Sequence, residues 1–294
     1  MKIKEIYQKY RHRIDIFDLE LIIAHTLGKN REFVLTHLEY RVPQNRISKL
    51  KKLIKRRLKH EPIAYIFGQK EFFGLDFKVN RHTLIPRPET EMLVEEVLKF
   101  DLKNKIIIDV GTGSGNIIIS IAHNIRHKKW NNVKFFATDI SAGAIKIAKE
   151  NAKIHKVSRK IKFIRGNLLT SFIPSTRHQT ANTSIIIVAN LPYLSKKIYD
   201  TTTPDIKKYE PRSALVSEIN GLDHYQKLLR QIKKIIATYP STGQTEKPRI
   251  AICLEFNPEQ KSALQILIKF ILSDVKTEFK KDLTGKWRFC RILL

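Results

Sequence analysis

The sequence has few cysteines and no long apolar run. Its two cysteines, Cys253 and Cys290, lie inside apolar, strand-like segments, with no Cys-x-x-Cys pair and no histidine at a ligand spacing. This pattern argues against a metal site and is typical of a protein in a reducing, cytoplasmic compartment. Residues 1–15 lack the apolar core of a signal peptide, and no segment is long enough to span a bilayer, so we expect no membrane association.

Acidic residues are scarce relative to basic ones. The 294 residues include 55 Lys and Arg but 28 Asp and Glu, which gives a net charge of +27. Such an excess suits a polyanionic partner such as RNA, but it also fits a compositional bias, because the basic residues extend from Lys2 to Arg291. The densest block, residues 49–59, has apolar residues at helical spacing and is explained as the solvated face of an amphipathic helix. We favour bias, and expect at most non-specific contact with polyanions.

The first third of the chain predicts a small helical domain followed by a connection. Hydrophobic residues make up 42% of the sequence, enough for a sizeable core. We expect residues 1–75 to form the helical domain and residues 76–102 to hold a hairpin or linker and a lead-in helix. The aromatic-rich stretch Ile63–Val79 indicates a short hairpin. The expected helices are Asp18–Gly28, Arg31–Leu38, Gln44–His60 and Met92–Phe100.

Strands and helices alternate from about residue 103 to the end. Continuous apolar strands separated by helices are typical of a mainly parallel sheet covered on both faces, and the last two strands can form an antiparallel hairpin. We therefore predict an α/β, Rossmann-like domain over residues 103–294, with polar loops at 176–183 and 239–247. The predicted strands are Ile106–Val110, Val133–Thr138, Ile161–Ile164, Ser184–Ala189, Ile250–Phe256, Val275–Lys280 and Arg288–Leu293, and the predicted helices are Asn116–His123, Ala142–His155, Leu222–Ala237 and Pro258–Leu272.

A glycine-rich turn, Asp-Val-Gly-Thr-Gly-Ser-Gly-Asn at 109–116, follows the first of these strands. It opens a helix, which is the geometry in which backbone N–H groups meet a bound cofactor. Its spacing departs from the dinucleotide fingerprint Gly-x-Gly-x-x-Gly, because Asn116 replaces the third glycine. The next strand ends in Asp139, whose carboxylate can accept both hydroxyls of a ribose or, alternatively, can be the N-cap of the next helix. The candidate cofactor residues here are Gly111, Thr112, Gly113, Ser114, Gly115 and Asp139.

The third predicted strand is followed by Gly166-Asn167-Leu168. The glycine turn and Asp139 resemble the cofactor site of S-adenosylmethionine-dependent methyltransferases, in which an acid or amide at this position meets the adenine amino group. The resemblance implies that the Asn167 amide oxygen can take this role and that the backbone N–H beside Leu168 can serve the adenine ring. An ordinary Gly-Asn turn is the alternative. We include Asn167 and Leu168 among the candidate cofactor residues.

The tetrapeptide Asn190-Leu191-Pro192-Tyr193 ends the apolar run 184–189. After a glycine turn, such a tetrapeptide resembles that of S-adenosylmethionine-dependent methyltransferases that methylate a planar nitrogen. A planar NH2 group is a poor nucleophile because its lone pair is delocalised. The Asn190 side chain and the Leu191 carbonyl can accept its two hydrogens, while Pro192 stiffens the backbone and Tyr193 can stack on the planar group or close the pocket. We expect catalytic roles for Asn190, Pro192 and Tyr193, substrate contacts from all four residues, and a cofactor contact from Asn190. A tight turn with packing residues is the alternative for the tetrapeptide taken alone.

These motifs resemble those of S-adenosylmethionine-dependent methyltransferases that modify a planar nitrogen. More narrowly, the chain resembles the protein-glutamine N5-methyltransferase family that acts on class I peptide chain release factors. The resemblance covers nearly the whole chain, and residues 85–91 and 209–215 are its most specific segments. The matching stretches are Ala24–Gly28 with Arg31, Glu61–Gly68, Glu71–Leu75, Leu84–Glu91, the glycine turn, the Asn-x-Pro-Tyr box, Tyr209–Leu215, Gly221–Asp223, Leu254–Phe256 with Gln260, and Asp282–Gly285.

The resemblance implies a reaction and a partner. The cofactor would be S-adenosylmethionine, the product S-adenosylhomocysteine, and no metal would be needed. The acceptor would be the glutamine of a Gly-Gly-Gln loop in a class I release factor. The helical domain, residues 1–75, would recognise that substrate, and residues 103–294 would transfer the methyl group.

Leu191 is a departure from the family's usual Asn-Pro-Pro-Tyr box, although leucine keeps the backbone carbonyl. The form Asn-Leu-Pro-Tyr also occurs in ribosomal RNA adenine-N6 dimethyltransferases, an alternative that suits the basic charge. Those enzymes carry a helical domain after the cofactor domain, whereas the helical part is N-terminal here. A non-catalytic, RNA-binding Rossmann module is a further alternative, disfavoured because Asp139 and Asn190 are both present.

Overall fold

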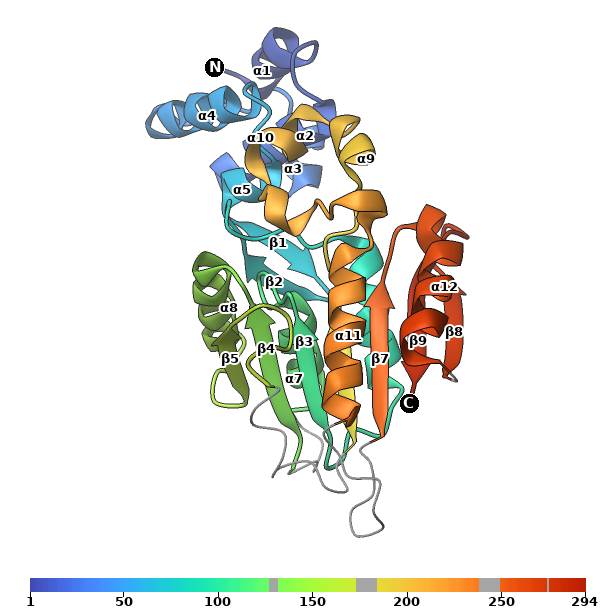
Figure 1. Ribbon diagram of the computed structural model, residues 1–294. Helices are drawn as coiled ribbons and strands as arrows, with labels where there is room; N and C mark the ends of the chain where they lie inside the picture. The colour runs from blue at the N-terminus through green and yellow to red at the C-terminus, as the bar shows by residue number, and fades with distance from the viewer. Residues whose placement is uncertain (127–131, 173–183, 238–248, 274) are drawn as a thin grey trace. The chain divides into compact units, whose positions relative to one another are not determined.

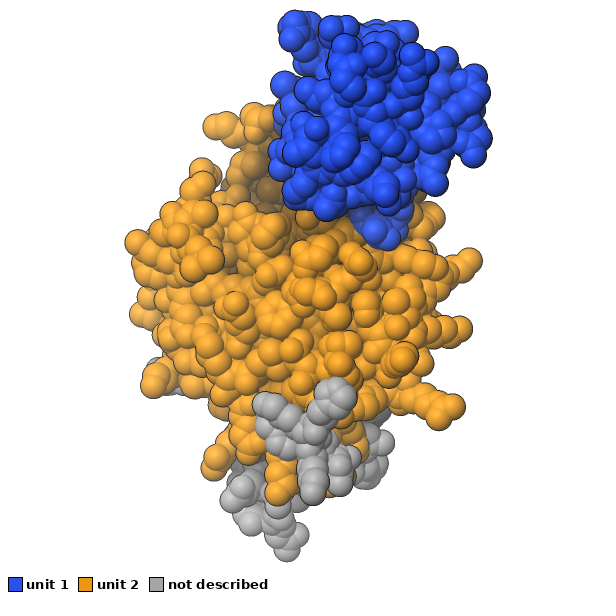
Figure 2. Space-filling model, turned by 180° about the vertical axis from the view of Figure 1, so that it is seen from behind, with its two compact units in different colours: residues 1–69, 203–209 blue, residues 70–202, 210–294 orange. Residues whose placement is uncertain are grey.

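The computed structural model describes residues 1–126, 132–172, 184–237, 249–273 and 275–294. The chain divides into two compact units, one of residues 1–69 with 203–209 and one of residues 70–202 with 210–294 (Figure 2). The polar loops expected at 176–183 and 239–247 lie outside the described residues. Among the helices that are described, none has both the length and the apolar character needed to cross a membrane.

The first unit, which we call the helical unit, is a cluster of short helices around an apolar core. α2 begins where the Asp15 side chain accepts a hydrogen bond from the backbone N–H of Asp18, at 3.2 Å. The last helix of the unit comes from residues 204–209, and the Tyr209 hydroxyl donates to the Lys59 carbonyl at 3.1 Å. The helices are α1 (Ile3–Tyr10), α2 (Ile16–Leu27), α3 (Arg31–Thr36), α4 (Gln44–Arg57), α5 (Ile63–Phe67) and α10 (Pro204–Tyr209).

The prediction of a hairpin over Ile63–Val79 is wrong in its first part, because Ile63–Phe67 is helical. The hairpin is confined to β1 (Gln69–Phe72) and β2 (Leu75–Lys78). Pro62 precedes the first helical residue and Gly68 follows the last, so the five apolar residues between them close one helical turn. So short an apolar run does not distinguish a strand from a helix by its periodicity.

The second unit, the sheet unit, is built on a seven-stranded sheet with the order β5-β4-β3-β6-β7-β9-β8. β3 pairs in parallel with β4 on one side and β6 on the other. β9 is antiparallel to both of its neighbours, β7 and β8. The predicted fold class, a mainly parallel sheet with a C-terminal antiparallel hairpin after a helical region, is confirmed. The strands are β3 (Ile106–Val110), β4 (Lys134–Asp139), β5 (Ile161–Arg165), β6 (Ile185–Ala189), β7 (Ile250–Glu255), β8 (Lys276–Lys281) and β9 (Trp287–Leu293).

Helices cover both faces of this sheet (Figure 1). Along β3, Ile107 packs into the apolar cluster with α6 and α7, whereas Ile106 and Ile108 pack into the cluster with α11 and α12. Burial on both faces explains why β3 and β6 read as unbroken apolar runs. The helices of the unit are α6 (Glu91–Leu98), α7 (Asn116–Asn124), α8 (Ala142–Ile154), α9 (Lys196–Asp200), α11 (Asp223–Ala237) and α12 (Lys261–Leu272), and its 3-10 turns are η1 (Pro88–Thr90), η3 (Arg212–Ala214), η4 (Ile219–Gly221) and η5 (Pro258–Gln260).

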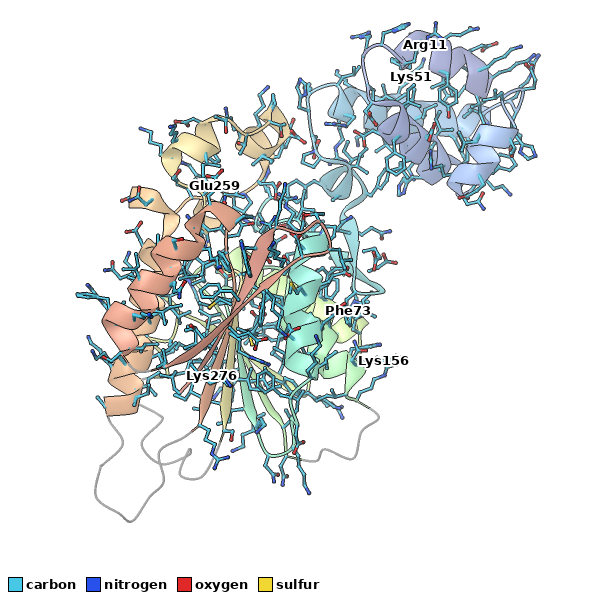
Figure 3. All side chains as sticks on the ribbon, turned by 90° about the vertical axis from the view of Figure 1, so that its right-hand side faces the viewer. Arg11, Lys51, Phe73, Lys156, Glu259 and Lys276 are labelled. Carbon is cyan, nitrogen blue, oxygen red and sulfur yellow. The ribbon has the colours of Figure 1, made fainter. Side chains whose placement is uncertain are left out.

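Basic side chains are exposed on many separate elements. Arg11 and Lys51 belong to the helical unit, whereas Lys156 and Lys276 belong to the sheet unit (Figure 3). All four are solvent-exposed. The basic excess is therefore distributed along the chain, as its sequence indicates.

Truncation of a buried side chain in a central strand tests how much the core of the sheet unit contributes to the free energy of unfolding. Ile186 in β6 is 1% exposed, so Ile186→Ala is expected to lower the free energy of unfolding by about 2–5 kcal/mol. Ile266→Ala is the control, because Ile266 on α12 is 69% exposed, and its expected change is within about 0.5 kcal/mol. Urea denaturation measures both changes. Equal effects of the two substitutions would contradict this account of the core.

Candidate active site

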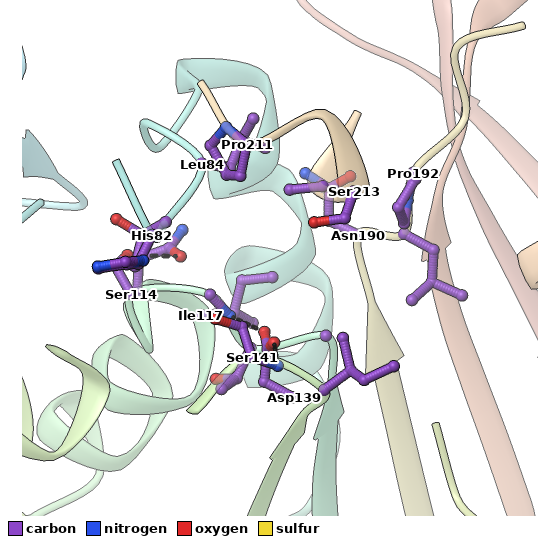
Figure 4. A pocket seen from close by; sticks show the side chains of 18 of the residues that line it. His82, Leu84, Ser114, Ile117, Asp139, Ser141, Asn190, Pro192, Pro211 and Ser213 are labelled. Atoms are coloured by element: carbon purple, nitrogen blue, oxygen red, sulfur yellow. Dashed lines mark hydrogen bonds between the residues drawn. The ribbon is translucent and has the colours of Figure 1, made fainter. Parts of the chain in front are cut away.

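A cavity of about 290 Å³ opens in the sheet unit where four parallel strands end. The segments that follow β3, β4, β5 and β6 all contribute to its wall. Figure 4 shows Asp139, Asn190 and Ser213 around this cavity, each from a different segment. Carboxyl ends of adjacent parallel strands are where α/β proteins place ligands. The candidate residues that line the cavity are Gly111, Thr112, Gly113, Ser114, Asp139, Asn167, Leu168, Asn190, Leu191 and Pro192.

The glycine turn after β3 is fixed by backbone hydrogen bonds from the neighbouring strand. The N–H groups of Gly111 and Thr112 both donate to the Thr138 carbonyl, each at 2.9 Å. The Thr112 hydroxyl donates to the buried Asp109 carboxylate at 2.6 Å. Burial raises the pKa of Asp109 to about 7, against the opposing effect of this hydrogen bond. The turn is therefore held in shape by its own strands.

Gly115 does not line the cavity, unlike Gly111, Thr112, Gly113 and Ser114. Its φ of +81° is left-handed. A Cβ there would lie 2.7 Å from Ile119 Cδ1 and 3.2 Å from Ala148 Cβ. Glycine at this position lets α7 pack closely against α8.

Asp139 ends β4 and faces the glycine turn. Its two carboxylate oxygens accept backbone hydrogen bonds, one from Gly113 N–H at 2.9 Å and one from Ser141 N–H at 2.8 Å. The N-cap of α8 is Ser141, whose hydroxyl accepts from Ala144 N–H. Burial raises the pKa of Asp139 above its ordinary value, and the two backbone hydrogen bonds oppose that shift. Each oxygen keeps a second lone pair at the cavity wall, so Asp139 can still accept from a ligand.

The end of β5 contributes a tight turn to the same wall. Leu168 has a φ of +54° and is buried, whereas the Asn167 side chain is exposed. The Asn167 carbonyl accepts from the N–H of Thr170 at 3.1 Å. This turn leaves the Asn167 amide available at the cavity.

Asn190 is held from behind by a short chain of hydrogen bonds. Its Nδ2 donates to the Thr90 hydroxyl at 3.0 Å, and that hydroxyl donates to Glu255 Oε2 at 2.7 Å. Thr90 and Glu255 are each 2% exposed. Burial raises the pKa of the Glu255 carboxyl to about 7, and the hydrogen bond from Thr90 opposes that shift. Asn190 Oδ1 has no protein partner among the described residues.

Leu191 packs into the sheet unit through its side chain, and its carbonyl lies beside the Tyr225 hydroxyl. The side chain is buried, and a Cβ on Gly111 would lie 3.1 Å from Leu191 Cδ2. The buried Tyr225 hydroxyl lies 3.2 Å from the Leu191 carbonyl and 2.6 Å from the Glu255 carbonyl. A carbonyl oxygen has two lone pairs, so Leu191 keeps one for a ligand.

Tyr193 turns away from the cavity, which it does not line. Its hydroxyl donates to Glu255 Oε1 at 3.3 Å, and its carbonyl accepts from Gln260 Nε2 at 2.8 Å. Burial raises the pKa of the Tyr193 hydroxyl, and the nearby Glu255 adds to the shift. Gly221, at φ +77°, is required beside it because any Cβ would collide with the Tyr193 carbonyl. Tyr193 thus fastens the end of the tetrapeptide to β7 and to η5.

The opposite wall comes from the two segments that are most specific in the sequence. The buried Glu210 carboxylate accepts from the Ile85 N–H at 3.1 Å and from the Arg87 guanidinium at 2.5 Å. These contacts join residues 85–87 to Glu210. The residue after it, Pro211, also lines the cavity. Sequence reasoning identified both segments but assigned them no role. The lining residues that were not among the candidates are Arg81, His82, Thr83, Leu84, Pro86, Arg87, Thr90, Asn116, Ile117, Ile140, Ser141, Gly166, Pro211, Ser213, Ala214 and His224.

His82 and His224 both line the cavity. His82 packs over Gly143, where a Cβ would lie 2.6 Å from the imidazole Cγ. Burial lowers the pKa of His224, and the charge of Lys227 adds to this effect, so neutral imidazole is favoured. Nothing in the sequence around His82 or His224 indicated that either side chain lines the cavity.

The sheet order with its single antiparallel strand, the glycine turn and the acid at the end of the next strand together define a Rossmann-like methyltransferase. A family model described as "Methyltransferase domain" matches residues 101–242, and one described as "PrmC N-terminal domain" matches residues 9–68. Among solved structures, the catalytic domain of hMettl16 in complex with an RNA hairpin has a TM-score of 0.54 at 13% identity, over 92% of this chain and 89% of that one. At this identity the likeness concerns the fold alone.

Curated relatives narrow the class. The chain is 34% identical to the release factor glutamine methyltransferase of Clostridium botulinum, over 92% of this chain and 89% of that protein. It is also 34% identical to the protein of the same name from Dictyoglomus turgidum, over 94% of this chain and 90% of that protein. The chain therefore belongs to the release factor glutamine methyltransferase family, as its sequence motifs indicated.

The raised pKa of Glu255 predicts a pH dependence of stability. Because the folded pKa, about 7, exceeds the ordinary value of a glutamate, the neutral carboxyl stabilises the fold at low pH. That contribution is complete below the unfolded pKa and is lost as the pH rises through about 7. Glu255→Gln stays neutral, so its free energy of unfolding relative to wild type should rise by up to about 3 kcal/mol between pH 5 and 8.

Chemical denaturation at several pH values measures this difference. Glu259→Gln is the matched control, because it makes the same substitution at an exposed glutamate. A constant difference for Glu255→Gln across the same range would show that Glu255 does not titrate there.

Proposed function

We propose that this chain transfers a methyl group from S-adenosylmethionine to the side-chain amide nitrogen, N5, of a glutamine in the Gly-Gly-Gln motif of class I peptide chain release factors. The observation that carries the proposal is the pair of acceptors at the end of β6. Within the part of the chain that the structure describes, Asn190 Oδ1 lacks a protein partner, and the next residue supplies a backbone carbonyl with a spare lone pair. Two adjacent acceptors on a cavity wall suit an NH2 group, and membership of the family supports glutamine as its source.

The residues at the ends of β3, β4 and β5 fit the proposed cofactor. The glycine turn offers backbone without side chains, Asp139 offers carboxylate lone pairs for ribose hydroxyls, and Asn167 with the buried Leu168 offers an amide and an apolar surface for adenine. When bound, S-adenosylmethionine supplies a methyl group on a positively charged sulfur. The residues that would hold it are Gly111, Thr112, Gly113, Ser114, Asp139, Asn167, Leu168 and Asn190, with Gly115 shaping the turn.

The proposed catalytic work of the protein is orientation. Asn190 Oδ1 and the Leu191 carbonyl would accept the two hydrogens of the glutamine NH2 and turn its nitrogen towards the methyl group. The same two oxygens oppose the positive charge that the nitrogen acquires during transfer. Pro192 limits the backbone freedom of Leu191, and Tyr193 fixes the far end of the box. The methylated nitrogen is then acidic enough to lose a proton to water, so neither His82 nor His224 is needed as a base.

The helical unit would hold the release factor. Apolar side chains remain exposed on it, including Ile16 at 52% and Phe17 at 50%. The further exposed apolar residues of this unit are Leu35, Leu38 and Tyr40. Such side chains on a small domain support a protein-binding role.

Methyl transfer from labelled cofactor to a purified release factor tests the proposed function. Ribosomal small-subunit RNA is the competing substrate, and a release factor whose Gly-Gly-Gln glutamine is replaced by alanine is the control. Label on the unaltered release factor alone would support the proposal. Label on the RNA, or equal label on the altered release factor, would contradict it.

Removal of Asn190 tests the proposed acceptor. Asn190→Ala should lower the rate of methyl transfer by about 100-fold or more, because one preorganised polar group at the reacting centre is lost. The affinity for cofactor should change far less. Single-turnover kinetics at saturating cofactor measure the rate. Asn124→Ala is the matched control, since Asn124 binds the Ser120 carbonyl on α7, and a full-rate Asn190→Ala enzyme would refute the mechanism.

Removal of the Asp139 carboxylate tests the proposed ribose contact. Asp139→Ala should weaken cofactor binding by at least about tenfold, because hydrogen bonds to a charged group contribute about 1.5–3 kcal/mol each. Calorimetric titration with S-adenosylhomocysteine measures the affinity. Asp101→Ala, at an exposed position, should bind like wild type. An unaltered affinity for Asp139→Ala would remove this residue from the proposed site.

A further inference from the structure

The ionised form of Glu255 fixes the direction of the hydrogen bonds behind Asn190. An ionised carboxylate has no hydrogen to donate, so Glu255 Oε2 can only accept from the Thr90 hydroxyl, 2.7 Å away. Thr90 has one hydroxyl hydrogen, which this bond uses. Towards Asn190, 3.0 Å away, the Thr90 oxygen can therefore only accept. The part of the Asn190 amide that faces Thr90 must be its NH2 group.

We propose that Thr90 and Glu255 are positioning residues that orient the Asn190 amide so that its oxygen, and not its NH2 group, meets the acceptor nitrogen. The two ends of an amide have nearly the same shape, so the cavity wall by itself discriminates weakly between them. A reversed Asn190 would present hydrogens to an NH2 group, which needs acceptors. This inference rests on the proposed function, because it assigns the partner of Asn190 Oδ1 to the target amide.

When Glu255 is ionised, both of its carboxylate oxygens are acceptors. Tyr193 donates to Oε1 at 3.3 Å, so each carboxylate oxygen receives one hydroxyl hydrogen. The charged groups that act on Glu255 are Arg288, which favours the ionised form, and Glu89, which opposes it. Once protonated, the carboxyl carries a hydrogen that it can donate to Thr90, and the Thr90 hydroxyl can then donate to Asn190 instead. Protonation of Glu255 thus removes the preference for one amide orientation.

Substitutions at Thr90 separate orientation from packing. Thr90→Val keeps the shape and removes the hydroxyl, so the methyl-transfer rate at saturating cofactor should fall by about 10- to 100-fold, with cofactor affinity nearly unchanged. Thr90→Ser restores the hydroxyl and should recover a rate within about threefold of wild type. Thr201→Val is the matched control, because it removes a threonine hydroxyl of the sheet unit that donates to the Ile198 carbonyl at 2.7 Å and does not line the cavity, and its rate should equal that of wild type.

The pH profile gives a second readout that a purely structural role would not move. The wild-type rate at saturating cofactor should rise with pH as Glu255 ionises, near its pKa of about 7. Glu255→Gln should have a low methyl-transfer rate that does not vary with pH across the same range. Its amide NH2 can donate to the Thr90 hydroxyl, which can then donate to Asn190, so the direction of these hydrogen bonds is reversed. This measurement decides the proposal if Thr90→Val fails to fold.

The outcomes distinguish the inference from the function on which it rests. If wild type methylates the release factor and Thr90→Val, correctly folded, does so at the full rate, the positioning role is wrong and the proposed function stands. A Glu255→Gln enzyme as fast as wild type at pH 8 would also overturn the positioning role. If wild type methylates no release factor, the proposed function itself fails.

Discussion

The buried carboxylate of Glu255 is the acceptor on which the geometry of the site depends. It lies at the end of β7 and receives the hydroxyls of Thr90, from the segment before α6, and of Tyr193, from the box after β6. Its backbone carbonyl accepts from Tyr225, which also lies within hydrogen-bond distance of Leu191. Thr90, Tyr193 and Tyr225 are far apart in the sequence, and Glu255 accepts a hydrogen bond from each of them. Burying such an acid is costly, and the cost is offset because both oxygens are hydrogen-bonded.

A second buried acid, Glu210, holds segments of the cavity wall together through hydrogen bonds, as Glu255 does for the tetrapeptide at 190–193. It binds the Ile85 N–H and the Arg87 guanidinium, so the two most specific sequence segments meet at one carboxylate. The cavity is therefore bounded by short loops, each tied to a buried acceptor. Its polar atoms are fixed before any ligand arrives, which is the condition for orienting a weak nucleophile.

Much of the sheet unit could be predicted because periodicity and local motifs determine it. The apolar runs correctly predicted that β3 and β6 are strands buried within the sheet. The glycine turn correctly predicted an edge of the cavity. Contacts between distant segments could not be predicted in this way. Nothing in the residues around Thr90 indicates that its hydroxyl lies between Asn190 and Glu255. The residues around Tyr193 likewise do not indicate whether its side chain faces the cavity or β7. Ile63–Phe67 is too short for its periodicity to separate helix from strand.

The central claim, that Asn190 Oδ1 and the Leu191 carbonyl hold the target NH2 group, is tested most directly by a crystal structure with S-adenosylhomocysteine and a Gly-Gly-Gln peptide of a release factor. The account predicts that the glutamine nitrogen lies about 3 Å from both oxygens, with Asn190 Nδ2 still bound to Thr90. A glutamine nitrogen that contacts neither oxygen, or an Asn190 amide turned with Nδ2 towards it, would contradict the account.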